Sequence, residues 1–210
     1  VNPDDVVKAY GADTMRLYIM FIGDFEKVAT WSDDAVKGCK RFLDRVWNLA
    51  DQVTEEKGVS EKNAPIVHKT IKKVTDDIDT LKMNTAIAAL MSMVNEFYAN
   101  GLSRGDLEAL LLMLSPFAPH MVEELWEQKG FAAEHDGKMA MQCDWPVYDE
   151  SKTVASSVEM AVQVGGKLKG TITVPVDSDQ DTVVEAAKAN EKVAKALAGM
   201  QIVKVIHVKN

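Results

Sequence analysis

Three basic side chains recur on one face of a predicted helix. Lys37, Arg41 and Arg45 are spaced by four residues, which places them on the same side of a helix. Like charges at this spacing repel one another unless an anion or a neighbouring acid relieves them; Asp33, Asp34 and Asp44 are the acids nearby. Phosphate is one anion that would do so. The spacing leaves open a phosphate-binding face and an ordinary solvated one.

Residues that could perform catalysis form no recognisable set. The glycine pair Gly165-Gly166 joins two predicted strands, so it belongs to a turn and not to a phosphate-binding loop. Cys39 and Cys143 lack metal-ligand spacing with any histidine, and we interpret both as packed or idle thiols. His120 begins an apolar helix face and is more typical of a first turn or a core than of a general base. We expect no catalytic residue, cofactor or metal in this chain.

Charge and hydropathy argue against a nucleic-acid coating protein, a membrane protein and a secreted protein. The chain has 210 residues, 47% of them hydrophobic, and a net charge of -8. Bulk negative charge excludes a protein that coats nucleic acid through positive charge, but it permits local contacts. No window approaches the ~18 apolar residues of a membrane span, and residues 1–5 lack the features of a signal peptide. We expect a cytoplasmic protein without membrane contact.

The elements that position these residues are helical over the first 150 positions. Apolar residues recur at steps of three and four, and Asn2, Ser32 and Gly101 mark helix boundaries. The pattern predicts helices over 3–10, 13–22, 33–57, 66–80, 84–99, 106–114 and 115–126. Residues 130–157 then form a connection, which we expect Trp145-Pro146 to fix to the helical body.

The period changes from 3.6 to 2 after this connection. Residues 158–164 and 168–174 alternate between apolar and polar, which predicts a β-hairpin with its turn at Gly165-Gly166. Ser178 with Asp181 predicts the start of a helical region that runs to Gly199, and 202–208 predicts a closing strand. The predicted fold class is α+β: a mainly α-helical bundle followed by a small α/β (ββ-helix-β) domain. These features alone suggest a binding or scaffolding protein.

Several short motifs resemble the C-terminal third of class I aminoacyl-tRNA synthetases. They occur in order along the chain at 10–16 (YGADTMR), 31–33 (WSD), 41–47 (RFLDRVW), 84–89 (NTAIAA), 116–120 (PFAPH) and 124–126 (ELW). Three others are similar to the leucyl-tRNA synthetases of bacteria: 145–150 (WPVYDE), 162–170 (VQVGGKLKG) and 203–206 (VKVI). The likeness extends over nearly the whole chain.

The resemblance implies a C-terminal fragment without the catalytic and editing domains. It implies a stem-contact segment at 1–30, a helical anticodon-binding-type domain at 31–150 and a C-terminal α/β tRNA-binding domain at 155–210. The fragment would position leucine tRNA and be inactive alone. The parent would be a leucine–tRNA ligase that uses ATP and magnesium, acts as a monomer and needs no obligate protein partner.

Contact with tRNA through phosphate would need local basic clusters. The candidates are Arg41 and Arg45, then Lys69, Lys72 and Lys73 on one helix side, and Lys167 and Lys169 on the hairpin. Each cluster could instead be plain surface charge, and the two lysines at 72 and 73 could pair with the aspartates four residues further on.

Two other interpretations stay open at this point. The helical surface could bind another protein, in which case the chain would be an independent interaction module. The motifs shared across the group also fit the equivalent part of an isoleucyl or valyl enzyme, although the hairpin sequence favours the leucyl group.

Overall fold

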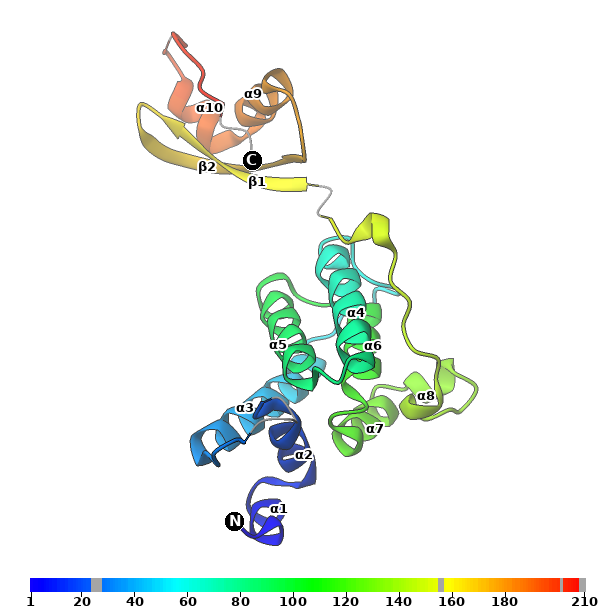
Figure 1. The fold of residues 1–210 in the computed structure, drawn as a ribbon. Coiled ribbons are helices and arrows are strands. Elements are labelled where there is room, and N and C mark those ends of the chain that lie inside the picture. Colours follow the sequence, from blue (N-terminus) through cyan, green and yellow to red (C-terminus); the bar gives the residue numbers. More distant parts are fainter. Residues whose placement is uncertain (24–27, 155–156, 201, 208–210) are drawn as a thin grey trace. The chain divides into compact units, whose positions relative to one another are not determined.

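The computed structural model describes residues 1–23, 28–154, 157–200 and 202–207. The chain divides into two compact units, Val1–Val154 and Ala155–Asn210, which are described separately below (Figure 1). A separate stem-contact segment at 1–30 and a domain beginning at residue 31 remain predictions. No helix of the described part is both long and apolar enough to cross a bilayer.

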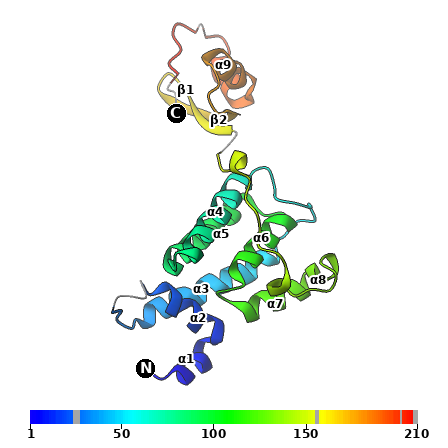
Figure 2. The same ribbon diagram turned by 45° about the vertical axis from the view of Figure 1, so that its right-hand side comes forward.

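The first unit is built from helices. They are α1 (Pro3–Tyr10), α2 (Ala12–Phe21), α3 (Asp33–Ala50), α4 (Ala64–Asp79), α5 (Met83–Asn100), α6 (Arg104–Leu114), α7 (Pro119–Gln128) and α8 (Phe131–Glu134), with short 3-10 turns at Ala140–Gln142 and Glu150–Lys152. Helices α4, α5 and α6 lie side by side, and α2 packs against α3, α5 and α7 (Figure 2). Their shared core includes the fully buried rings of Tyr18, Phe97 and Phe117.

Helix α3 is shorter than the predicted helix over 33–57. It ends at Ala50 because the following residues bond to a distant part of the chain. The backbone N–H of Thr54 donates to the carbonyl of Leu102 over 3.1 Å, and that of Arg104 donates to the carbonyl of Glu56 over 3.0 Å. These partners replace the helical ones, so the prediction of a helix to residue 57 was wrong.

Helix α7 begins four residues later than predicted. Residues 115–118 form a turn, and Pro119 stands at the first helical position, where its missing N–H costs nothing. The residue before a proline is disfavoured in helical conformation, and Ala118 accordingly has φ −136° and ψ 64°.

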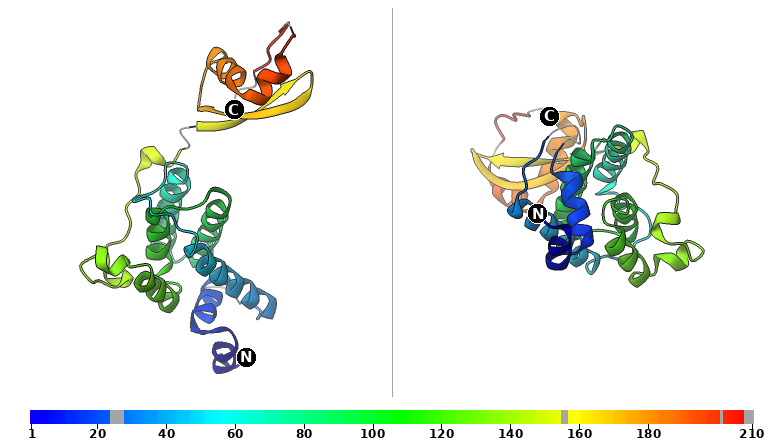
Figure 3. Two further views of the ribbon diagram at one scale, coloured as in Figure 1. Left: turned by 180° about the vertical axis from the view of Figure 1, so that it is seen from behind. Right: turned by 60° about the horizontal axis from the view of Figure 1, so that its bottom comes forward.

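The second unit is a β-hairpin covered by two helices. Strands β1 (Ser157–Val164) and β2 (Lys167–Pro175) pair antiparallel, and α9 (Gln180–Ala189) and α10 (Glu191–Leu197) pack against them (Figure 3). Gly165 and Gly166 have φ of 59° and 76°, as a primed two-residue turn requires. The predicted class, a helical body followed by a small α/β domain, is confirmed.

Two details of this unit differ from the prediction. Asp179 caps α9 by accepting from the backbone N–H of Thr182, whereas Ser178 donates its hydroxyl to the carbonyl of Pro175. Residues 202–207 form no strand in the described part, where the sheet has only β1 and β2, and residue 208 lies outside that part. A period of two makes a strand only where a sheet edge accepts it, so the predicted closing strand was wrong over 202–207.

Candidate nucleic-acid interface

Helix α3 presents four cationic side chains opposite its buried face. They are Lys37, Lys40, Arg41 and Arg45. The ammonium of Lys37 lies 3.5 Å from a carboxylate oxygen of Asp34. Lys40 pairs with Asp44. Within the described chain, neither arginine has a carboxylate partner, so these two remain available to an external anion.

The guanidinium of Arg45 lies over an aromatic ring from another helix. Its guanidinium carbon lies 4.7 Å from the ring centroid of Tyr98 on α5. The hydroxyl of Tyr98 donates to the backbone carbonyl of Arg45 over 2.8 Å. Its neighbour Phe97 is fully buried, whereas Tyr98 is 38% exposed.

The lysines of α4 differ in what they contact. Lys69 is exposed and has no acidic partner among the residues described. Lys73 pairs with Asp77, as the spacing of four predicts. Lys72 does not pair with Asp76, because both carboxylate oxygens of Glu150 lie 2.9 Å from its ammonium. This hydrogen bond raises the pKa of Lys72.

The segment that holds Glu150 is attached to α4 at several points. We call residues 145–154 the strap. The indole N–H of Trp145 donates to the hydroxyl of Thr75 over 2.8 Å, which confirms the predicted attachment. The backbone N–H of Asp149 donates to Nδ1 of His68 over 3.1 Å. Lys72 therefore helps to attach the strap to α4. An RNA phosphate would have to compete with Glu150 for the Lys72 ammonium.

The hairpin lysines are exposed, and the strand that carries them is irregular. Gln163 pairs with Leu168, but its neighbour Val162 pairs with Gly170, so Lys169 is an extra residue in β2. Such a bulge changes the direction of the side chains beside it. Leu168, the apolar residue between the two lysines, is 63% exposed. Lys167 and Lys169 thus flank an apolar side chain at the tip of the hairpin.

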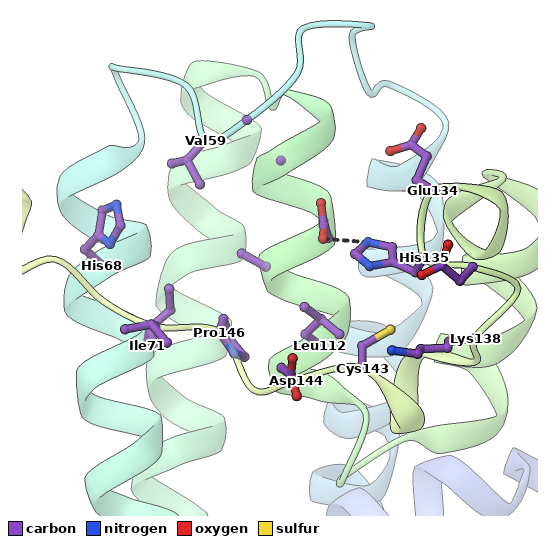
Figure 4. A pocket seen from close by; sticks show the side chains of 16 residues that line it. Val59, His68, Ile71, Leu112, Glu134, His135, Lys138, Cys143, Asp144 and Pro146 are labelled. Atoms are coloured by element: carbon purple, nitrogen blue, oxygen red, sulfur yellow. Dashed lines mark ion pairs between the residues drawn. The ribbon is translucent and has the colours of Figure 1, made fainter.

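A cavity of about 450 Å³ lies in the first unit, lined by α4, α6 and residues 134–147 (Figure 4). Nε2 of His135 lies 2.9 Å from a carboxylate oxygen of Glu108. The remaining charged side chains are mostly acidic: Glu134, Asp136 and Asp144 against Lys138. An acidic lining repels phosphate, so the cavity is a poor place for RNA.

Cys39 and His120, whose side chains are of types used in catalysis, are respectively inert and engaged. Burial raises the pKa of the Cys39 thiol to about 11, so it is protonated and a poor nucleophile at neutral pH. Nδ1 of His120 lies 2.8 Å from a carboxylate oxygen of Asp13, whose other oxygen accepts from the backbone of Met121. This pair fixes the start of α7. In the described ranges, no three His, Cys, Asp or Glu side chains are placed to hold a metal ion.

The chain resembles tRNA ligases and parts of them. A family model for the anticodon-binding domain of tRNA ligase matches residues 66–186, more than half of the chain. A leucine–tRNA ligase of Alkaliphilus oremlandii is 46% identical over 209 residues, covering 99% of this chain and 25% of that protein. The leucine–tRNA ligase of Chlorobaculum tepidum is 44% identical over 215 residues, covering 99% and 26%.

A solved structure agrees in fold as well as sequence. It is a leucyl-tRNA synthetase (LeuRS) of Agrobacterium radiobacter in a ternary complex with tRNA and LeuAMS. The two structures superpose with a TM-score of 0.65 at 28% identity, covering 100% of this chain and 29% of the other. The chain spans about a quarter of the length of the curated relatives it matches, in their C-terminal region. It belongs to the family of anticodon-binding domains of tRNA ligases.

Proposed function

We propose that this chain is the tRNA-binding part of a leucine–tRNA ligase, and that it positions leucine tRNA without taking part in catalysis. The observation that carries the proposal is 46% identity to a leucine–tRNA ligase over 99% of the chain. The solved relative in complex with tRNA supports the same partner. The whole enzyme would join leucine to its tRNA with ATP and magnesium, as a monomer in the cytoplasm.

The charge distribution supports binding through local contacts. With a net charge of -8, the chain gains little from long-range attraction to RNA. Arg41, Arg45 and Lys69 have no acidic partner among the described residues, whereas Lys72 and Lys73 do. A paired lysine must give up its carboxylate before it meets a phosphate. We expect the two arginines, Lys69 and the hairpin lysines to contribute most.

Binding of a leucine tRNA transcript, measured against salt concentration, tests this proposal. Each phosphate contact contributes about 0.7–0.9 to the slope of log affinity against log salt. Replacing Arg41 and Arg45 together by glutamine should lower the slope by about 1–2. The matched control replaces Lys37 and Lys40, which already pair with aspartates on the same helix, and should change the slope less.

A second pair of variants, Lys167→Gln and Lys169→Gln, applies the same measurement to the hairpin. Leucine-dependent ATP–pyrophosphate exchange by the chain alone should be absent. Exchange activity, or failure of the wild-type chain to bind the transcript at low salt, would refute the proposal.

A further inference from the structure

Arg45 and Tyr98 form a cation–π pair in the first unit. The guanidinium carbon lies 4.7 Å from the centre of the ring, and the tyrosine hydroxyl donates over 2.8 Å to the backbone of the same arginine. The two groups come from different helices, α3 and α5, so their arrangement is set by tertiary packing. The hydroxyl bond limits the freedom of the ring before any ligand arrives.

Tyr98 is not among the buried residues of the core. Phe97, the neighbour of Tyr98 on α5, is fully buried and supplies the apolar contact, while Tyr98 remains 38% exposed. The acid nearest in sequence to Arg45 is Asp44, which already pairs with Lys40. An arginine with an aromatic ring on one face and no carboxylate partner in the described chain has its donor edge unused.

Such a surface has the chemistry of a base-stacking site. Unpaired bases of RNA stack on aromatic rings and on guanidinium planes, and the positive charge adds attraction to the flanking phosphates. Arg41 lies one turn earlier on α3, is exposed and has no carboxylate partner among the described residues. A stacked nucleotide at Arg45 would therefore find a second cation within one helical turn for its phosphate.

We propose that Arg45 and Tyr98 form a stacking platform for one unpaired base of RNA, with Arg41 beside it as the phosphate contact. The proposal rests on the proposed tRNA-binding function and adds the mode of contact and a residue, Tyr98, outside the basic clusters. It differs from a simple phosphate contact in one respect. The plane of the side chain matters, and not only its charge.

Arg45→Lys separates these two modes because lysine keeps the charge but has no plane. If the side chain stacks on a base, this variant should weaken binding of the leucine tRNA transcript by roughly 5- to 150-fold, the range that loss of one stacked base produces. The salt slope should stay unchanged. Arg41→Lys, the matched control on the same helix, should bind within about twofold of wild type, because a phosphate contact tolerates lysine.

Tyr98→Leu should weaken binding to a similar extent, and the double variant with Arg45→Lys should be little worse than either single one, because the pair acts as a unit. Tyr98→Phe keeps the ring and should bind nearly as well as wild type. Urea unfolding of each variant checks that the helices are intact. If Tyr98→Leu unfolds, Arg45→Lys alone decides.

The outcomes separate the two proposals. If the wild-type chain binds the transcript and Arg45→Lys binds equally well, the platform is refuted while the tRNA-binding function stands. If Tyr98→Leu is folded and binds like wild type, the platform is again refuted. If the wild-type chain does not bind the transcript, both proposals fail.

Discussion

Asp13 lies on α2 but caps a helix more than one hundred residues away. Its carboxylate accepts from the backbone N–H of Met121 over 2.7 Å and lies 2.8 Å from Nδ1 of His120. Asp13→Ala would remove the acceptor of the partly exposed backbone donors at the start of α7, and should lower the free energy of unfolding by about 0.5–2 kcal/mol. Urea unfolding measures this. Asp13→Asn keeps one acceptor oxygen and should cost less, so equal losses would contradict the capping role.

Nδ1 of His68 accepts a hydrogen bond from the backbone N–H of Asp149. Only the neutral imidazole can accept this bond, so His68 holds the strap while it is unprotonated. Burial lowers its pKa below the ordinary value of 6.5, nearby Lys152 lowers it further, and Asp149 opposes the shift. Because the unfolded chain takes up the proton first, this stabilisation is complete above pH 6.5 and is lost as pH falls through the lowered value.

The prediction is that the free energy of unfolding falls more between pH 7.5 and pH 5.5 in wild type than in His68→Gln, whose side chain does not titrate. Urea unfolding at the two pH values provides the comparison. Equal pH dependence of the free energy of unfolding in the two proteins would show that protonation of His68 does not weaken the attachment of the strap.

At the scale of the elements, two helical glycines predict opposite results for the same substitution. A Cβ on Gly105 of α6 would lie 2.0 Å from the backbone carbonyl carbon of Gly58, so Gly105→Ala must move a loop and should destabilise by about 1–3 kcal/mol. A Cβ on Gly38 of α3 would meet only the end of Arg41 at 4.0 Å. Gly38→Ala should therefore stabilise by about 0.5–1 kcal/mol. Thermal or urea unfolding of both variants, with similar helicity before melting, checks the contrast.

Sequence periodicity predicted the order of the helices but not every helix end. Helices with a strong apolar stripe were predicted in the right order, because the stripe is a local signal. The end of α3 was not, because the residues after Ala50 are held by bonds to 102–104 and by Gly58 against Gly105. Contacts between segments fifty residues apart leave no periodic pattern in either one.

The candidate interface was also predicted only in part from the sequence. Basic residues at helical spacing, including Arg41 and Arg45, were recognisable from the sequence. Their partners were not: Tyr98 reaches Arg45 from α5, and Glu150 reaches Lys72 from the strap. The bulge at Lys169 could not be predicted either, because alternation of apolar and polar residues assumes a regular strand. Local spacing identifies cations, but tertiary structure decides which of them are already neutralised.

At the scale of the whole molecule, the two units have very unequal cores. In the second unit, Ile172, Val174 and Val193 are the only buried apolar side chains among the described residues. The first unit buries many, including Trp126 and Phe131. A domain of about fifty residues with so small a core has little stability of its own. We therefore expect the second unit to unfold at lower urea concentration than the first.

The sequence allows this order to be measured without labels, because all tryptophans and tyrosines precede residue 155. Intrinsic fluorescence therefore reports on the first unit alone, whereas far-ultraviolet circular dichroism reports on both. We predict that the circular dichroism signal begins to fall at lower urea than the fluorescence signal. Val193→Ala should move only this early phase, by the equivalent of about 1.5–3 kcal/mol. Superimposable curves that shift together in Val193→Ala would mean that the units unfold as one cooperative structure.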